Sequence, residues 1–190
     1  LAAAWRRPEA QFTGLERDEA AVALARRNVE ANGMTGVTVV QGDVAAGFRA
    51  LALPVFDAVI CNPPFFEDAS SLRAPAPEKH GAWIAGDGLD AWTGFLLKAV
   101  REGGTITVIH RADALPALLE GLAPKAGSFR IRPVHPFADA SAKRVLVRAV
   151  KTGKAPLVLL PPLVLHARGA EGHRPEVEAI LRGRSGLPWT

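Results

Sequence analysis

The segment Asn62-Pro63-Pro64-Phe65 contains the residue types that can hold a planar NH2 group for reaction. The nitrogen of an amide or aryl amine is a poor nucleophile because its lone pair is delocalised, so the lone pair must be aimed at the electrophile. The Asn62 side-chain oxygen and the Pro63 carbonyl can each accept one NH2 hydrogen, and the prolines keep these acceptors rigidly spaced. Phe65 offers a flat face on which a base can stack. A simple turn after a strand also explains Asn-Pro-Pro, but the full motif favours chemistry on nitrogen.

Two acidic residues follow predicted strands and could bind a nucleoside. Residues 11–16 predict a strand that ends at Glu16, whose carboxylate can accept both hydroxyl hydrogens of a ribose. Residues 37–41 predict a second strand, followed by Gly42 and by Asp43, whose carboxylate can accept from the exocyclic amine of adenine. Ligands of open α/β sheets bind at the carboxyl ends of the strands. Each residue alone is a weak signal, because a solvated strand end or a turn cap explains it equally well.

The elements that must position these residues alternate between strands and helices. Further strands are predicted over 55–61, 105–110, 128–134 and 144–150, and helices over 18–33, 89–100, 114–122 and 175–181. Residues 66–87 are interpreted as a loop, and the apolar stretch 157–166 is split by Pro161-Pro162. The alternation predicts an α/β fold with parallel strands, and the last two strands predict an antiparallel hairpin at one edge.

Composition limits the class of protein. Cys61 is the single cysteine, which excludes an internal disulfide and favours a cytoplasmic protein. No apolar run approaches the roughly 20 residues that cross a bilayer, and the histidines lack metal-ligand spacing, so we expect no metal and no membrane partner. The net charge of +4 is compatible with a polyanionic partner. Arg111, Lys143 and Arg144 stand at strand ends and could contact phosphate, although solvated strand ends are the simpler interpretation.

The order of these features resembles that of class I S-adenosylmethionine-dependent methyltransferases of the small-domain type. An acidic strand end, Gly-Asp after the next strand, Asn-Pro-Pro-Phe after the third and Gly-Gly before the fourth follow in turn. The chain looks most similar to bacterial enzymes that methylate adenine N6 in a valine tRNA. Three stretches carry that closer similarity: 104–111, 143–149 and 161–166.

The resemblance implies a Rossmann-like sheet of seven strands in the order 3-2-1-4-5-7-6, with the last strand antiparallel. It implies S-adenosylmethionine as cofactor, and the residues that match the family's cofactor site are Glu16 for the ribose, Asp43 with the Val44 amide for the adenine, and Asn62. The motif Asn62, Pro63, Pro64 and Phe65 would hold the exocyclic amine of adenine in a tRNA substrate. The same motif occurs in rRNA guanine-N2 and protein glutamine methyltransferases, which remain alternatives. A truncated, inactive RNA-binding module is a third.

The family's first strand and its glycine-rich turn would lie upstream of Leu1, which we interpret as part of a helix already under way. We therefore expect a methyltransferase core over 1–151 that is N-terminally incomplete, with a C-terminal extension over 152–190 packing on it. A sheet without its first strand leaves a gap between the strands that end at Glu16 and at Cys61. We expect an N-terminal segment outside this sequence to fill that gap, rather than a strand from another molecule or a collapse of the two edges.

Overall fold

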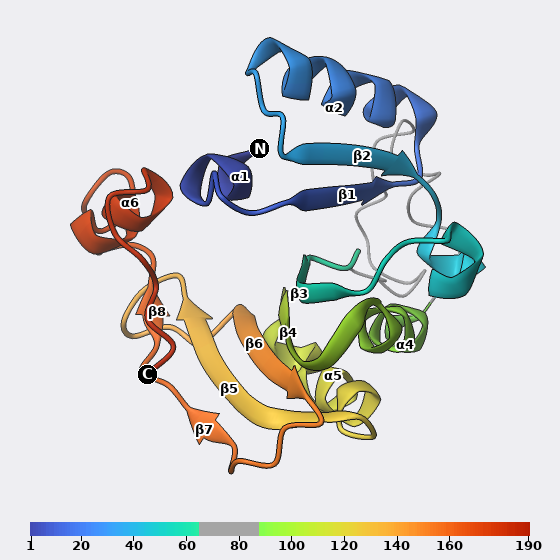
Figure 1. Ribbon diagram of the computed structural model, residues 1–190. Coiled ribbons are helices and arrows are strands. Elements are labelled where there is room, and N and C mark those ends of the chain that lie inside the picture. Colours follow the sequence, from blue (N-terminus) through green and yellow to red (C-terminus); the bar gives the residue numbers. More distant parts are fainter. Residues whose placement is uncertain (65–87) are drawn as a thin grey trace, which may run out of the picture. The chain divides into compact units, whose positions relative to one another are not determined.

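The computed structural model describes residues 1–64 and 88–190, which divide into two compact units, Leu1–Ala52 and Leu53–Thr190 (Figure 1). Both units combine helices with strands, so the predicted α/β fold is confirmed. Among the described helices, none has the length and apolar character that would let it cross a membrane.

Unit 1 is a two-stranded parallel sheet with short helices. The elements in chain order are α1 (Ala2–Arg6), β1 (Phe12–Glu16), α2 (Glu19–Ala31), β2 (Val37–Gln41) and the 3-10 turns η1 (Val44–Ala46) and η2 (Phe48–Leu51). The two strands pair in step, so that Glu16 lies beside Gln41 where both strands end. The Asp18 side chain caps α2 by accepting from the Ala21 amide at 2.7 Å, as predicted.

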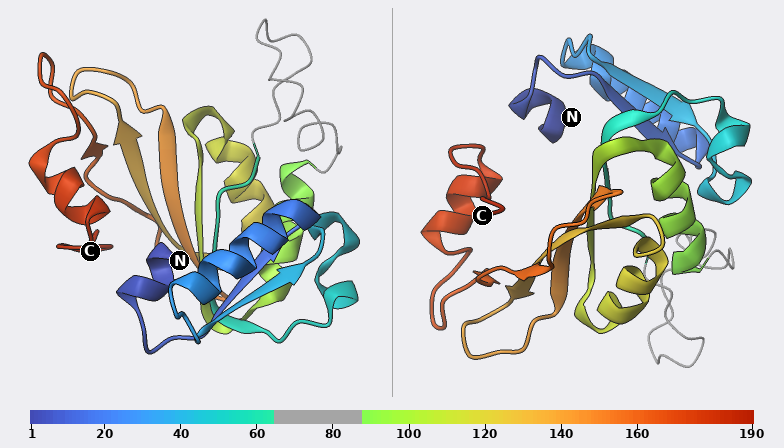
Figure 2. Two further views of the ribbon diagram at one scale, coloured as in Figure 1. Left: turned by 90° about the horizontal axis from the view of Figure 1, so that it is seen from above. Right: turned by 60° about the horizontal axis from the view of Figure 1, so that its bottom comes forward.

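Unit 2 is built on a mixed sheet in which β3 (Phe56–Cys61), β4 (Val100–Arg111), β6 (Arg144–Lys151) and β5 (Ala126–His135) are neighbours in that order (Figures 1 and 2). β3 and β4 are parallel, whereas β6 is antiparallel to both β4 and β5. This order matches the 4-5-7-6 part of the sheet that the resemblance implies, including its antiparallel last strand. The 3-2 part matches β2 beside β1 in unit 1.

The expectation that the β5–β6 hairpin forms the edge of the sheet is wrong. Two short strands, β7 (Val158–Leu159) and β8 (Leu163–Val164), pair in parallel with β5 on its other side. Pro161-Pro162 cannot donate to a ladder, so they divide the apolar stretch into two brief pairings. The chain then forms α6 (Pro175–Leu181).

The start of β4 also differs from the prediction. The strand begins directly at Val100, where the helix α4 (Leu89–Ala99) ends, rather than after the glycine pair. Gly103 adopts φ +73°, and a Cβ at Gly104 would come within 2.7 Å of the Asp57 carbonyl oxygen. The two glycines thus allow an irregular stretch inside the strand instead of stopping the helix.

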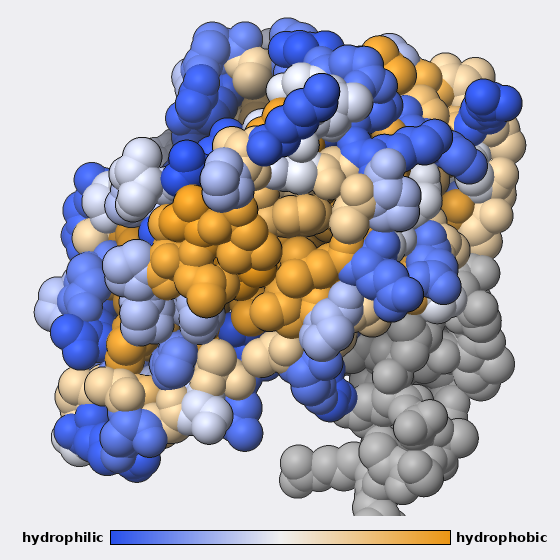
Figure 3. All heavy atoms as spheres, turned by 90° about the horizontal axis from the view of Figure 1, so that it is seen from below, coloured by the Kyte–Doolittle hydropathy of each residue, from blue (hydrophilic) through white to orange (hydrophobic). Residues whose placement is uncertain are grey.

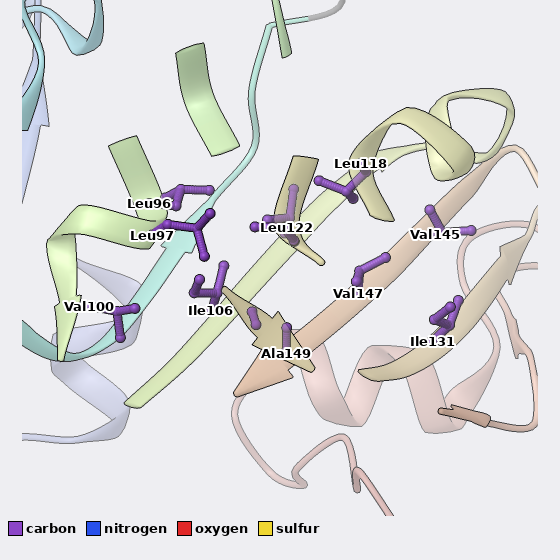
Figure 4. Packing of buried hydrophobic residues seen from close by; sticks show 12 residues of the cluster. Leu96, Leu97, Val100, Ile106, Leu118, Leu122, Ile131, Val145, Val147 and Ala149 are labelled. Atoms are coloured by element: carbon purple, nitrogen blue, oxygen red, sulfur yellow. The ribbon is translucent and has the colours of Figure 1, made fainter. Parts of the chain in front are cut away.

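The core of unit 2 lies between the sheet and the helices α4 and α5 (Leu115–Leu122) (Figure 4). Ile106, Val147 and Leu118 are fully buried there. Alternate residues of β4 and β6 point into this layer, as expected for a period of two. Helix packing on this face therefore holds β4 and β6 in place, and it fixes the carboxyl end of β4 beside the amino end of β6.

β1 and β3 each have one edge that is not paired with another strand among the described residues. β1 pairs with β2 and β3 with β4, so each has one such edge, as the sequence predicted. Some apolar side chains lie at the surface (Figure 3). The exposed large apolar residues of unit 2 include Ile60 in β3, which is 68% exposed, and Leu159 in β7, which is 69% exposed.

Candidate functional site

In unit 1, the end of β1 fixes the carboxylate of Glu16. Its Oε1 accepts hydrogen bonds from the backbone amides of Arg17 at 2.7 Å and Asp18 at 2.9 Å. The side chain is exposed, yet these two bonds hold it in one orientation. A carboxylate fixed in this way is ready to accept the hydroxyl hydrogens of a ligand through its second oxygen.

The end of β2 brings Asp43 to the same edge of the unit 1 sheet. The Gly42 amide donates to the Glu16 carbonyl at 2.9 Å, which ties the two strand ends together. A Cβ at Gly42 would lie 2.6 Å from Leu51 Cδ2 and 3.0 Å from Leu15 Cδ1, so a larger residue at this turn would require these leucine side chains to shift. The structure therefore brings the predicted residues Glu16 and Asp43 together.

Asp43 also acts as a cap, which is the alternative that the sequence left open. Its Oδ1 accepts from the Ala45 amide at 2.9 Å at the start of η1, and the half-buried Val44 is the first residue of that turn. Oδ2 lies 3.6 Å from the guanidinium of Arg17. Sequence reasoning missed Arg17, although its place directly after an acidic strand end is a signal that could have indicated it.

In unit 2, β3 ends in the predicted motif. Pro63 is fully buried, Pro64 is half-buried and Asn62 is exposed. The buried proline ring anchors the backbone directly beside the asparagine, so the side-chain amide of Asn62 projects from a fixed point. Phe65 and the predicted loop 66–87 lie outside the described residues.

Cys61 precedes the motif and packs against the core of unit 2. Burial raises the pKa of its thiol to about 12. The thiol is therefore neutral near pH 7 and is not a thiolate nucleophile.

The strand next to β3 places charged groups at the same edge of the sheet. Arg111, the last residue of β4, lies opposite Arg144, the first residue of β6. The Arg111 guanidinium binds the Asp113 carboxylate and lowers the pKa of that carboxyl.

His110 is 5% exposed, and its burial lowers the pKa of the imidazole. In the part of the chain that the structure describes, no three His, Cys, Asp or Glu side chains converge as a metal site would require.

The chain shares sequence with known methyltransferases. Residues 1–75 match the family model described as the methyltransferase small domain. The chain is 32% identical over 138 residues to the release factor glutamine methyltransferase of Moorella thermoacetica, covering 68% of this chain and 47% of that relative. It is 31% identical over 121 residues to the 4-amino-L-phenylalanine/4-methylamino-L-phenylalanine methyltransferase of Streptomyces pristinaespiralis, covering 58% and 40%.

A more distant relative is named as an RNA methyltransferase. The chain is 27% identical over 150 residues to the ribosomal RNA large subunit methyltransferase F of Salmonella paratyphi B, covering 64% of this chain and 48% of that relative. The chain thus spans about half the length or less of these three relatives, at 47%, 40% and 48%.

Among solved structures, a predicted O-methyltransferase from Agrobacterium tumefaciens superposes with a TM-score of 0.80 at 26% identity, covering 98% of this chain and 84% of that one. The fold is the Rossmann-like methyltransferase fold. The family match over residues 1–75 and the fold are both features of class I methyltransferases, which use S-adenosylmethionine.

The acceptors of unit 1 fit this cofactor. The locked carboxylate of Glu16 matches the two hydroxyl donors of a ribose, and the Asp43 carboxylate, one strand away, matches the amine of adenine. These two assignments and that of Val44 remain predictions. So does the closer resemblance to the tRNA adenine-N6 enzymes.

Proposed function

We propose that the chain belongs to an S-adenosylmethionine-dependent methyltransferase that acts on a planar, conjugated nitrogen, with the exocyclic amine of adenine in RNA as its substrate. The observation that carries this proposal is the exposed Asn62 next to the fully buried Pro63 at the end of β3. When bound, the cofactor supplies an electrophilic methyl group on a sulfonium.

The residues of this chain have a positioning role in the proposed reaction. The Asn62 side-chain oxygen and the Pro63 carbonyl accept the two NH2 hydrogens, which directs the lone pair out of the plane toward the methyl group. Burial of Pro63 keeps the two acceptors in place before the substrate arrives. The nitrogen becomes acidic as it is methylated, so no strong general base is required. In unit 1, Glu16 and Asp43 bind the nucleoside part of the cofactor.

The names of two relatives support a planar nitrogen as the atom that receives the methyl group. A glutamine side chain has an amide NH2 and 4-amino-L-phenylalanine has an aryl NH2, and both resemble the exocyclic amine of a base. The Agrobacterium structure is described as a predicted O-methyltransferase. A hydroxyl has one hydrogen to donate, however, whereas the Asn-Pro pair offers two acceptors. Nitrogen is therefore the better match.

RNA is favoured as the substrate class by the net charge of +4 and by the rRNA methyltransferase among the relatives. The transfer RNA assignment rests on the resemblance of 104–111, 143–149 and 161–166. A protein glutamine is the second candidate, because the release factor methyltransferase is 32% identical to the chain.

The test incubates the intact-length protein with methyl-labelled S-adenosylmethionine and three substrates: unmodified tRNA, rRNA and a glutamine-containing release factor. We expect label in tRNA, recovered after digestion as N6-methyladenosine. Asn62→Ala should lower the turnover by about 100-fold while the Kd for the cofactor changes less than a few-fold, because Asn62 contacts the target amine. Label in the release factor alone would support the second candidate. Transfer to oxygen, or to none of the three, would overturn the proposal.

A further inference from the structure

The topology of unit 2 brings several separate segments to the edge where Asn62 lies. β3, β4, β5 and β8 are mutually parallel, and β6 runs the opposite way. The segments that follow β4, β5 and β8 therefore share an edge with the segment after β3, and so does the start of β6. Three segments thus flank the motif along this edge: 111–114, 135–144 and 165–174.

Four planar side chains from two of these segments lie in successive contact and form what we call the stacking cluster: Phe137, His166, Arg168 and His173. The Arg168 guanidinium lies over the Phe137 ring, 4.5 Å from its centroid. The Phe137 and His166 rings are 5.9 Å apart with an interplanar angle of 49°, and the His166 and His173 rings stack at 4.9 Å and 23°. The two ends of the stack, Arg168 and His173, are open to solvent, with 64% and 38% of their side chains exposed.

The backbone holds the cluster in place. The His166 amide donates to the Pro136 carbonyl at 2.9 Å, and the Arg174 amide donates to the Leu165 carbonyl at 2.8 Å. His166 Nδ1 lies 2.7 Å from the Gly172 carbonyl oxygen. The Asp139 carboxylate accepts from Arg168 Nε at 2.8 Å and keeps the guanidinium over Phe137. A ligand that stacks here would therefore order few side chains on binding.

The charges along the edge favour an anionic ligand. The three segments contain five Lys or Arg residues and three Asp or Glu residues, so these groups sum to a positive charge. Planar cationic and aromatic faces beside positive charge are the features by which proteins hold single-stranded nucleic acid, because every base has a π-face and every nucleotide a phosphate. A peptide offers such flat faces only at aromatic residues, so RNA is the better match.

We propose that the stacking cluster holds a nucleotide of single-stranded RNA that flanks the nucleotide presented to Asn62. The inference rests on the proposed function, since it assigns a place to the substrate of that same motif. β5 lies three strands from β3, or about 14 Å. A few nucleotides of a splayed strand bridge that separation. The cluster would thus select unpaired RNA next to the target base.

The test uses a 12-nucleotide single-stranded RNA with a central adenine and 2-aminopurine placed two or three nucleotides away, mixed with the full chain. Stacking quenches 2-aminopurine fluorescence, so the signal reports base stacking rather than charge. We expect quenching on binding. Arg168→Lys keeps the positive charge but removes the guanidinium plane, and it should abolish the quenching and weaken binding by about tenfold. His173→Ala should act in the same direction at the other end of the stack.

Arg101→Lys is the matched control. The Arg101 side chain is 54% exposed and is also bound to a carboxylate, that of Asp57, but it lies near the start of β4, at the opposite edge of the sheet from the cluster. This variant should bind and quench like the parent chain. An unchanged Tm for Arg168→Lys excludes a folding defect as the cause of its effect.

The outcomes separate this inference from the proposed function. If tRNA is methylated but Arg168→Lys and His173→Ala quench normally, the cluster is not the site, and the proposed function stands. If quenching depends on the cluster but no substrate is methylated, the proposed function fails and the RNA site stands. Binding of a glutamine-containing peptide to the chain, with no binding of the RNA, would overturn the inference in favour of a protein ligand.

Discussion

The guanidinium of Arg17 lies 3.6 Å from the carboxylate of Asp43 and links the ends of β1 and β2. Both side chains are partly exposed, at 41% and 37%, so the ion pair by itself contributes little to stability. Its effect is to restrain the oxygen of Asp43 that is not used in capping η1. This contact gives a direct way to test the cofactor site.

We expect Asp43→Ala to raise the Kd for S-adenosylmethionine by at least tenfold, because it removes the acceptor for the adenine amine. Arg17→Ala should raise the Kd only about two- to fivefold, as expected for the loss of an exposed ion pair. The double variant should be no weaker than Asp43→Ala alone, since Arg17 acts through Asp43. Calorimetry measures all three, with Arg27→Ala on α2 as control. An unchanged Kd for Asp43→Ala would refute the assignment.

RNA affinity should depend steeply on salt. Each phosphate that a lysine or arginine contacts releases counterions, so the Kd should rise at least tenfold between about 50 and 200 mM salt. Lys143→Ala at the sheet edge should reduce the slope of log K against log salt by about 1. Lys98→Ala on α4 is the control and should leave the slope unchanged. A flat salt dependence would count against RNA as the ligand.

His110 predicts a pH dependence of stability. Burial disfavours the imidazolium form and lowers the pKa of His110 from 6.5, while the nearby Asp113 carboxylate opposes this shift. Below pH 6.5 the unfolded chain gains a proton on His110 that the folded chain does not bind. The free energy of unfolding should therefore fall as the pH is lowered from about 6.5 toward the folded-state pKa.

Denaturant titrations of the parent chain and of His110→Leu between pH 5 and 8 test this expectation. As the pH falls through this window, the unfolding free energy of the parent chain should decrease relative to that of His110→Leu. The carboxyl groups whose pKa values are lowered, such as Asp113, titrate below it and do not interfere. A difference that stays constant with pH would show that His110 is not responsible.

Leu118→Ala should destabilise unit 2 by about 2–5 kcal/mol, because Leu118 is completely buried between α5 and the sheet. Leu181→Ala on α6 is the matched control, since Leu181 is 62% exposed and its truncation should cost less than about 0.5 kcal/mol. Urea denaturation measures both. Equal effects would mean that the core is not packed as Figure 4 shows.

Much of the fold could be predicted because its signals are local. The cap at Asp18, the hairpin of β5 and β6 and the final helix α6 each depend on residue types within a few positions. The early start of β4 could not be predicted, because glycine pairs usually end helices, and tolerance of Gly103-Gly104 inside a strand depends on the neighbouring strand β3.

Some residues of the candidate site could likewise be predicted from the sequence, whereas the contacts of the stacking cluster could not. Asn62, Glu16 and Asp43 could be identified because each follows a strand directly, and strand ends are where α/β sheets bind ligands. The ring contacts of Phe137 with His166 and Arg168 could not be foreseen. They arise only because β8 pairs with β5, a long-range pairing of two residues that leaves no periodic pattern in the sequence.

The position of β6 between β4 and β5 has a consequence for the order in which the protein forms during synthesis. β6 ends at Lys151, so the ribosome must complete most of the chain before this strand is available. Until then, β4 and β5 each have an unpaired edge, that of β4 being rich in β-branched residues, and no hairpin between the two strands is possible because they run in the same direction. The nascent chain is therefore most prone to aggregation while residues up to about 143 have emerged, and the arrival of one strand closes both edges at once.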